Sequence, residues 1–277
     1  MTNQLAIIEQ QTMDLLNKEW NILKKYSKTG DEQAKDIMRT AALAIMDSAD
    51  LQKALQTPQG QVALIHAMKY ALRTGLSLNP QEGKSALIAY GGKVQYQIMK
   101  NGYVEKAMSS PNVKLLNSKV IKENDTFELS EDETGCHYTF KPALTNRGKV
   151  LGYAAVLVFH TGEVYAEYMT REEVEAHQNV YVKYKSAAWR DSFDGMALKT
   201  VIKKLLRNVS VSPELKEAVG IDDNQEAIVN DIEIADAEEI QDINAKLAKA
   251  KEEKEAQEPK VLTPEEQAEI AKQEAQG

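Results

Sequence analysis

Hydrophobic residues along this chain follow two different spacings, and the order in which these spacings occur limits the possible folds. Residues 4–25 and 31–75 carry apolar side chains at helical spacing. Residues 85–169 instead contain short β-branched and aromatic runs separated by turn sequences, and helical spacing returns at Thr170. Because helices and strands are grouped rather than alternating, the sequence predicts an α+β fold with N-terminal helices, a central, mostly antiparallel sheet and C-terminal helices.

Turn residues and caps place the individual elements. The β-prone runs 85–90 and 93–98 flank the dipeptide Gly91-Gly92 and predict a hairpin. A short helix is expected within Gln97–Met108. Further strands are expected at Lys114–Ile121, Cys136–Lys141, Val150–His160 and Val164–Met169. The C-terminal helices are expected to begin at Thr170, at about Ala187 and at Ser212.

Charge divides the chain near residue 220. Residues 221–277 hold 17 acidic and 6 basic residues, whereas residues 1–220 hold 25 acidic and 28 basic residues. The C-terminal segment has too little apolar surface to offset the entropy of ordering, so we expect a mobile acidic tail with nascent helix. A near-neutral to basic body with an acidic tail favours a nucleic-acid partner, although a purely solubilising tail would have the same composition. The expected organisation is an N-terminal helix over 1–30 as an assembly element, a core over 31–220 and the tail over 221–277.

Several classes of protein are disfavoured by simple patterns. The single cysteine, Cys136, forms no internal disulfide and fits a reducing compartment. The chain shows no run of about 18 apolar residues and no signal-peptide pattern, which predicts a cytoplasmic protein without a membrane span. Gly83-Lys84-Ser85 lacks the earlier glycine of a phosphate-binding loop, and the four histidines lack metal-ligand spacing, so no cofactor or metal is expected.

An acidic segment supports the main enzymatic alternative. Its carboxylates are Asp125, Glu128, Glu131, Asp132 and Glu133. Such a group is able to hold the metal ion of a nuclease, but no basic partner on a following strand accompanies it. A charge run without an apolar frame usually faces water, so a solvated loop is favoured.

The strongest local signal lies in residues 181–207, which hold seven basic and two acidic residues. Lys199, Lys203 and Arg207 are spaced four apart, which predicts a basic stripe on one face of a helix whose opposite face is buried. Crowded like charges favour a phosphodiester backbone as ligand, with an ordinary solvated face as the alternative. Four aromatic residues are interleaved among these basic residues and either stack on bases or pack in the core: Tyr181, Tyr184, Trp189 and Phe193. A weaker group of suitable donors follows the hairpin turn: Lys93, Gln95, Tyr96, Gln97, Lys100, Asn101, Gly102 and Tyr103.

Four blocks of the sequence, residues 75–107, 120–130, 165–177 and 187–219, together form a recognisable series. The last block contains the pattern W-x-x-x-F-x-x-M-A-x-K-T-x-x-x-x-L, which begins at Trp189 and ends at Leu205. The series resembles the RecT family of phage and prophage single-strand annealing proteins, which are functionally akin to the Red beta protein. The four blocks in this order are specific, although no single block is.

The resemblance implies DNA annealing rather than enzyme catalysis. Proteins of this family bind single-stranded DNA and pair complementary strands without ATP, as rings or helical filaments that hold the DNA in a basic groove. The implied partners are single-stranded DNA, the annealed duplex and further copies of the chain, in the cytoplasm of a bacterial host cell. A phage 5′-to-3′ exonuclease or a host single-strand-binding protein docking on the tail is a looser implication. The alternatives are a metal-dependent DNA nuclease and a structural filament protein.

The basic helix and the hairpin both fall inside matching blocks, so DNA contact is assigned to them by resemblance. Phosphate binding is assigned first to Lys199, Lys203, Lys204, Arg207 and Arg190, and then to Lys100, Lys93, Lys183 and Lys185. Contact with sugar or base is assigned to Gln95, Tyr96, Asn101 and Tyr103, while Thr200 is expected to be either a phosphate donor or a buried helix residue. No nucleophile, general base or metal is required, because base pairing between the strands reads the sequence and the protein contacts the backbone.

Overall fold

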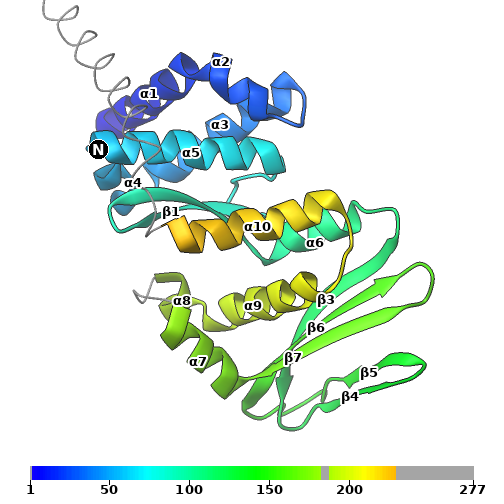
Figure 1. The fold of residues 1–277 in the computed structure, drawn as a ribbon. Helices are drawn as coiled ribbons and strands as arrows, with labels where there is room; N and C mark the ends of the chain where they lie inside the picture. Colours follow the sequence, from blue (N-terminus) through cyan, green and yellow to red (C-terminus); the bar gives the residue numbers. More distant parts are fainter. Residues whose placement is uncertain (1, 182–186, 229–277) are drawn as a thin grey trace, which may run out of the picture. The chain divides into compact units, whose positions relative to one another are not determined.

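Helices make up the N-terminal part of the computed structural model, which describes residues 2–181 and 187–228 (Figure 1). They are α1 (Thr2–Lys18), α2 (Trp20–Leu23), the 3-10 helix η1 (Lys24–Tyr26), α3 (Asp31–Met46), α4 (Ala49–Ala54) and α5 (Pro58–Thr74). Helix α3 buries side chains three and four residues apart, among them Ala34, Ile37 and Met38, and α1 packs against it. The helical spacing in the sequence therefore marks a real packing face.

Caps fix the ends of these helices. Ser48 Oγ accepts a hydrogen bond from the Leu51 amide at the start of α4, and Thr57 Oγ1 accepts one from the Gly60 amide at the start of α5. Gly75 ends α5 with a φ of 66°, a left-handed conformation that is strained for other residues. The chain can therefore leave α5 sharply and enter the hairpin.

The predicted hairpin is confirmed. Strands β1 (Ser85–Tyr90) and β2 (Lys93–Ile98) pair antiparallel, and Tyr90 lies opposite Lys93 across the turn. Both turn glycines have a positive φ, as a two-residue hairpin requires. Alternate residues of β2 are buried, β2 packs against α5, and α6 (Lys100–Met108) follows directly.

The central sheet has three antiparallel strands in the order β3-β6-β7. These strands are β3 (Val113–Lys122), β6 (Val150–Phe159) and β7 (Val164–Thr170). The middle strand β6 buries every residue from 152 to 157, so both of its faces are covered. Gly152 is needed there because a Cβ atom would lie 2.5 Å from the Met169 carbonyl oxygen on the neighbouring strand.

A second hairpin lies between β3 and β6 in the sequence. Its strands β4 (Thr126–Asp132) and β5 (Gly135–Lys141) pair antiparallel. The loop predicted over residues 125–133 is therefore wrong for most of that segment. Nearly all residues of β4 are exposed, and its apolar alternation consists of Phe127 and Leu129 alone, which is too short to identify a half-buried strand.

Four helices complete the described chain: α7 (Arg171–Tyr181), α8 (Ala187–Asp191), α9 (Phe193–Asn208) and α10 (Pro213–Ile228). Helix α7 begins with a capping box, in which the Glu173 amide donates to Thr170 Oγ1 at 3.1 Å and the Thr170 amide donates to Glu173 Oε2 at 2.8 Å. Helix α9 contacts all three strands of the central sheet and also α6 and α10, and Figure 1 shows it between α10 and the sheet.

The α+β class is thus confirmed, with helices before and after antiparallel sheets. All described residues belong to one unit, Met1–Asp231, and α10 continues past the expected boundary at residue 220. The rest of the predicted tail lies outside the described residues. Within the described part of the chain, no helix combines the length and the hydropathy needed to cross a membrane.

Candidate nucleic-acid interface

Helix α9 carries the residues predicted to form an exposed basic stripe. Lys199 and Lys203 are only 3% and 5% exposed, whereas Lys204 is half-buried and Arg207 is exposed. The predicted division of α9 into a basic solvent face and an apolar buried face is therefore wrong. The reason is tertiary, because the sheet, α6 and α10 all contact this helix. Neither buried lysine lacks an interaction partner, as the cost of desolvating an ammonium group requires.

Two other predicted phosphate ligands, Arg190 and Lys204, form ion pairs with carboxylates at or near the surface. Arg190 Nε lies 2.7 Å from Asp191 Oδ1, and both side chains are largely exposed. Lys204 Nζ lies 2.9 Å from Glu167 Oε1 on β7. Solvent-exposed ion pairs contribute little free energy, so exchanging the aspartate at Arg190 for a phosphate costs little. Arg190, in α8, is consequently accessible to a phosphate of DNA.

The other DNA contacts predicted in residues 181–207 are those of Thr200, Lys183 and Lys185. Thr200 Oγ1 donates a hydrogen bond to the Met196 carbonyl at 3.0 Å, so its proton is used within α9. Lys183 and Lys185 lie outside the described residues, as does Tyr184. Their assigned roles remain predictions.

The two tyrosines assigned to sugar or base contact are core residues. Tyr96 is 1% exposed, and its hydroxyl lies 2.6 Å from Thr74 Oγ1, while Tyr103 is fully buried. In this structure neither ring has surface to offer DNA, which corrects their assignment. Alternation along β2 explains the placement of Tyr96, since every second residue of that strand is buried.

The polar residues predicted to contact DNA after the hairpin turn lie on the opposite face of β2 and at the start of α6, where they are accessible. Lys93, Gln95 and Lys100 are half-buried, and Asn101 is exposed. Asn101 Nδ2 donates a hydrogen bond to the Glu82 carbonyl at 2.9 Å, which ties α6 to the loop before β1. We call these four residues the hairpin surface. It offers two cations and two amides, with Lys93 beside the hairpin turn and Lys100 and Asn101 in the first turn of α6.

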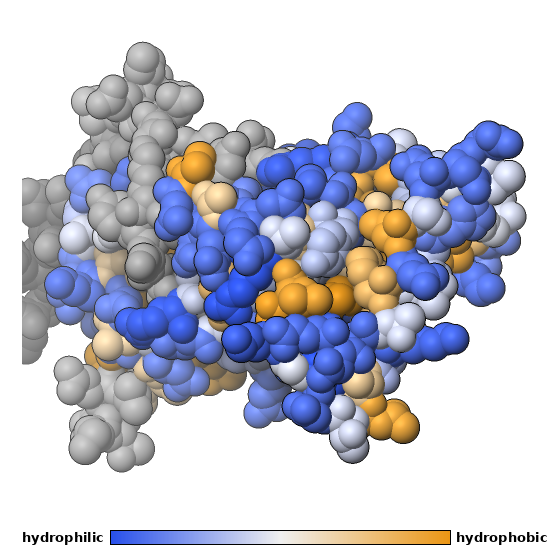
Figure 2. All heavy atoms as spheres, turned by 90° about the horizontal axis from the view of Figure 1, so that it is seen from below, coloured by the Kyte–Doolittle hydropathy of each residue, from blue (hydrophilic) through white to orange (hydrophobic). Residues whose placement is uncertain are grey.

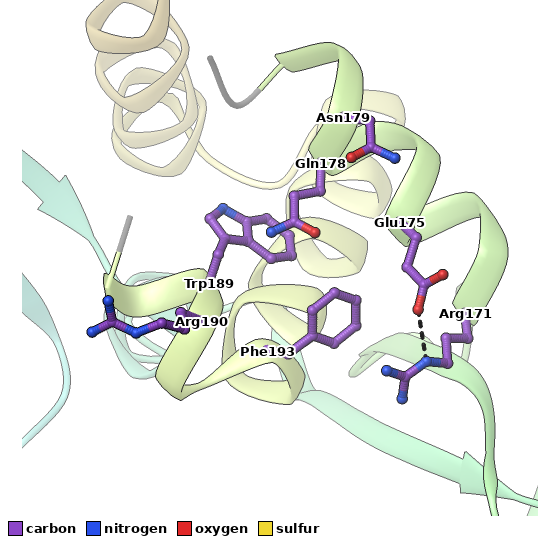
Figure 3. A pocket seen from close by; sticks show the side chains of 7 residues that line it. All are labelled: Arg171, Glu175, Gln178, Asn179, Trp189, Arg190 and Phe193. Atoms are coloured by element: carbon purple, nitrogen blue, oxygen red, sulfur yellow. Dashed lines mark hydrogen bonds and ion pairs between the residues drawn. The ribbon is translucent and has the colours of Figure 1, made fainter. Parts of the chain in front are cut away.

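A cavity of about 520 Å³ lies where α7, α8 and α9 meet (Figure 3). Its lining residues are Arg171, Glu175, Gln178, Asn179, Trp189, Arg190 and Phe193. Trp189, Arg190 and Phe193 lie in the segment that the sequence singles out, whereas the four residues of α7 do not. Those four occur at positions i, i+4, i+7 and i+8, so helical spacing places them on one face and was the available signal.

Aromatic and guanidinium groups pack closely in this cavity. Trp189 and Phe193 meet edge to face with ring centroids 5.5 Å apart. Arg171 Cζ lies 5.0 Å from the centroid of Phe193, and Arg171 Nε donates to Glu175 Oε1 at 2.8 Å. That hydrogen bond raises the pKa of Arg171 further. Trp189 is 6% exposed and belongs to the core, whereas Phe193 is only partly buried.

The acidic segment contains one carboxylate with a structural role. The Asp125 side chain is fully buried and accepts hydrogen bonds from Arg147 and from the amides of Lys122 and Ala143. The hydrogen bonds from Arg147 hold the pKa of Asp125 well below its usual range. Asp125 thus clasps the base of the β4–β5 hairpin. Among the described residues, no three histidine, cysteine or acidic side chains are placed to hold a metal ion.

The surface seen in Figure 2, from below the view of Figure 1, is mostly hydrophilic. Hydrophobic residues on this face form one larger group near its centre and several smaller, separate groups toward its edges, with hydrophilic residues between them. Large continuous apolar patches mark permanent protein interfaces. This face therefore suits contacts with water or with a polar ligand over most of its extent.

Comparison with known proteins identifies the family. The model of the RecT family matches residues 35–236. An uncharacterized protein of Bacillus subtilis, YqaK, is 28% identical over 65% of this chain and 63% of its own length. Protein RecT of Escherichia coli is 26% identical over 59% of this chain and 64% of its own length. The chain thus spans just under two thirds of each relative. Because the family model covers well over half of the sequence, the chain belongs to the RecT family.

Proposed function

We propose that this protein binds single-stranded DNA and anneals complementary strands without ATP, as a ring or filament of identical subunits. The observation that carries the proposal is the RecT family match over residues 35–236, which supports a role in DNA recombination and annealing. The charge distribution adds support, because the residues before 221 are net basic while the whole chain is net acidic. The charge argument alone would not distinguish annealing from other forms of DNA binding.

The accessible cations define where the backbone would bind. The hairpin surface offers Lys93 and Lys100, and the α8–α9 region offers Arg190, Lys204 and Arg207. Lys199 and Lys203 reach phosphates only if the groups that cover them move aside. Lys183 and Lys185 complete the proposed contacts of that region, and Gln95 and Asn101 would meet sugar or base.

Electrostatics then accounts for annealing. Two complementary strands repel each other through their phosphates, and lysine and arginine side chains on successive subunits would neutralise the first strand. Backbone contacts leave the base edges free, so a second strand is able to test its register by pairing. The protein needs no sequence code and no chemical step.

The acidic tail is the proposed site for protein partners. A segment with 17 acidic and 6 basic residues is suited to a basic surface on an exonuclease or a single-strand-binding protein. The same charge competes with DNA for the basic residues of the core.

A fluorescence annealing assay tests the proposal. One oligonucleotide carries a dye and its complement a quencher, and the full-length protein is added to the first strand before the second, without ATP or metal. We expect protein-dependent quenching that is faster than spontaneous annealing and absent with a non-complementary strand. No acceleration with intact strands would leave a DNA-binding or structural role, and strands shortened after magnesium is added would instead support a nuclease.

A further inference from the structure

The cavity between α7, α8 and α9 has a chemistry that phosphate binding does not use. Its inner wall is formed by Trp189 and Phe193, and Gln178 projects toward the indole ring (Figure 3). We propose that this cavity receives one unstacked nucleobase of bound single-stranded DNA until the complementary strand pairs with that base. The inference rests on the proposed function and adds to it a base-binding site.

The size and the lining of the cavity fit a base. A volume of about 520 Å³ lies within the range of small-ligand pockets, roughly 300–1,000 Å³. Aromatic side chains and arginine planes are the groups on which unstacked bases pack. Phe193 is partly buried with Arg171 over its ring, so an incoming base meets an aromatic and guanidinium surface that is already in place.

The polar groups of the cavity suit any of the four bases. Gln178 and Asn179 each carry both a donor and an acceptor, so their amides can pair with either kind of base-edge group. Gln178 is half-buried and Asn179 is exposed, which places them at the inner and outer part of the opening. A site built from rotatable amides favours a base in general rather than one particular base, as annealing of arbitrary sequences requires.

The position of the cavity explains why its occupant would belong to DNA. Arg190 lines the cavity and is largely exposed, so a phosphate held by its guanidinium brings the attached nucleotide to the opening. Glu175 pairs with Arg171 inside the cavity, whereas Arg190 pairs with the exposed Asp191, which a phosphate is able to replace at little cost. The surrounding segment 181–207 has seven basic and two acidic residues, so a polyanion is the ligand that the charge favours.

The test compares a normal strand with a strand that lacks bases. Affinities of the full-length protein for oligothymidine and for an abasic strand of equal length are measured by fluorescence anisotropy. Wild-type protein should bind the normal strand at least about fivefold more tightly, the lower end of the effect of one stacked base. The variant Gln178→Ala/Asn179→Ala keeps the stacking surface but lacks the amides that bind the base edge, so it should show a reduced preference and an unchanged affinity for the abasic strand.

A matched control and a second readout keep the test decisive. Glu172→Gln changes an exposed α7 residue outside the cavity and should leave the preference unchanged. In a Trp20→Phe background Trp189 is the sole tryptophan, and its fluorescence should be quenched by the normal strand but not by the abasic strand. Equal binding of both strands by wild type, or a full preference in the double variant, would overturn the base site alone. Failure of wild type to bind either strand would overturn the proposed function itself.

Discussion

The ion pair between Asp125 and Arg147 stabilises the base of the β4–β5 hairpin. Asp125 and Arg147 close the base of the β4–β5 hairpin, and Arg147 Nη2 also donates to the Val120 carbonyl at 2.9 Å on β3. The carboxylate is fully buried, while the guanidinium is one third exposed. Removing one partner of such a pair leaves the other without compensation for its lost hydration.

Loss of the Asp125–Arg147 ion pair should destabilise the fold in a pH-dependent way. Asp125→Asn should lower the free energy of unfolding at pH 7 by about 1–2 kcal/mol, the order of hydrogen bonds to a charged group, because Arg147 keeps part of its hydration. Because the pKa of Asp125 is lowered in the folded state, its stabilising effect is full above the unfolded pKa near ~4 and decreases as pH falls toward the folded value. Urea denaturation at pH 7 and pH 3 should show the difference from wild type shrinking with acid. An equal difference at both pH values would contradict this account, and Glu133→Gln, at the exposed hairpin turn, is the control.

Burial of Lys199 and Lys203 changes the expected result of reversing their charges. Sequence alone suggests that Lys199→Glu with Lys203→Glu abolishes DNA binding in a folded protein. Because both side chains are buried, we now expect this double variant to unfold at lower urea concentration than wild type. Arg207→Glu, at an exposed position of the same helix, should weaken single-strand binding and lower the unfolding midpoint far less than the double variant does. Normal stability of the double variant would show that the two lysines are easily released to solvent.

At the level of elements, β2 separates two kinds of residue. Its buried side holds Tyr96 against the N-terminal helices, and its other side holds Lys93 and Gln95. The turn at Gly91-Gly92 and the two strands were predictable, because turn chemistry and β propensity agree there. The exposed strand β4 was not predicted, because its hydrophobic period consists of Phe127 and Leu129 alone.

The hairpin surface yields a prediction about salt dependence. Lys93→Glu with Lys100→Glu should weaken binding to oligothymidine and reduce the slope of log affinity against log salt by about 1.4, or about 0.7 for each lost phosphate contact. Anisotropy titrations over a range of salt concentrations measure the slope. Lys53→Glu, an equal charge change at an exposed position of α4, should alter it far less. Identical slopes in all three proteins would place the DNA elsewhere.

Across the whole molecule, the sequence predicted classes of structure better than contacts between them. The α+β order, the strands of the central sheet and the capping box of α7 follow from local patterns. Burial of Lys199 and Lys203 depends on α6, α10 and the sheet meeting α9, which no local pattern encodes. The same holds for the cavity, since Arg171 and Phe193 belong to different helices.

The extent of α10 sharpens the prediction for the acidic tail. Val219 and Ile221 are buried and α10 ends at Ile228, so a cut at residue 220 would remove part of a packed helix. Deleting residues 229–277 instead removes 14 acidic and 6 basic residues and leaves the helix whole. We expect single-strand affinity and annealing rate to be unchanged or higher, because competing negative charge is lost. Loss of annealing in a folded truncation would show that the tail takes part in the reaction.

The most direct test of the central claim is the annealing rate of two complementary oligonucleotides at increasing salt, measured with the full-length protein and without ATP. We expect a rate well above the spontaneous one at low salt, a steep fall as salt rises, and no signal with a non-complementary strand. A rate equal to the spontaneous one at every salt concentration, with the strands intact, would contradict it.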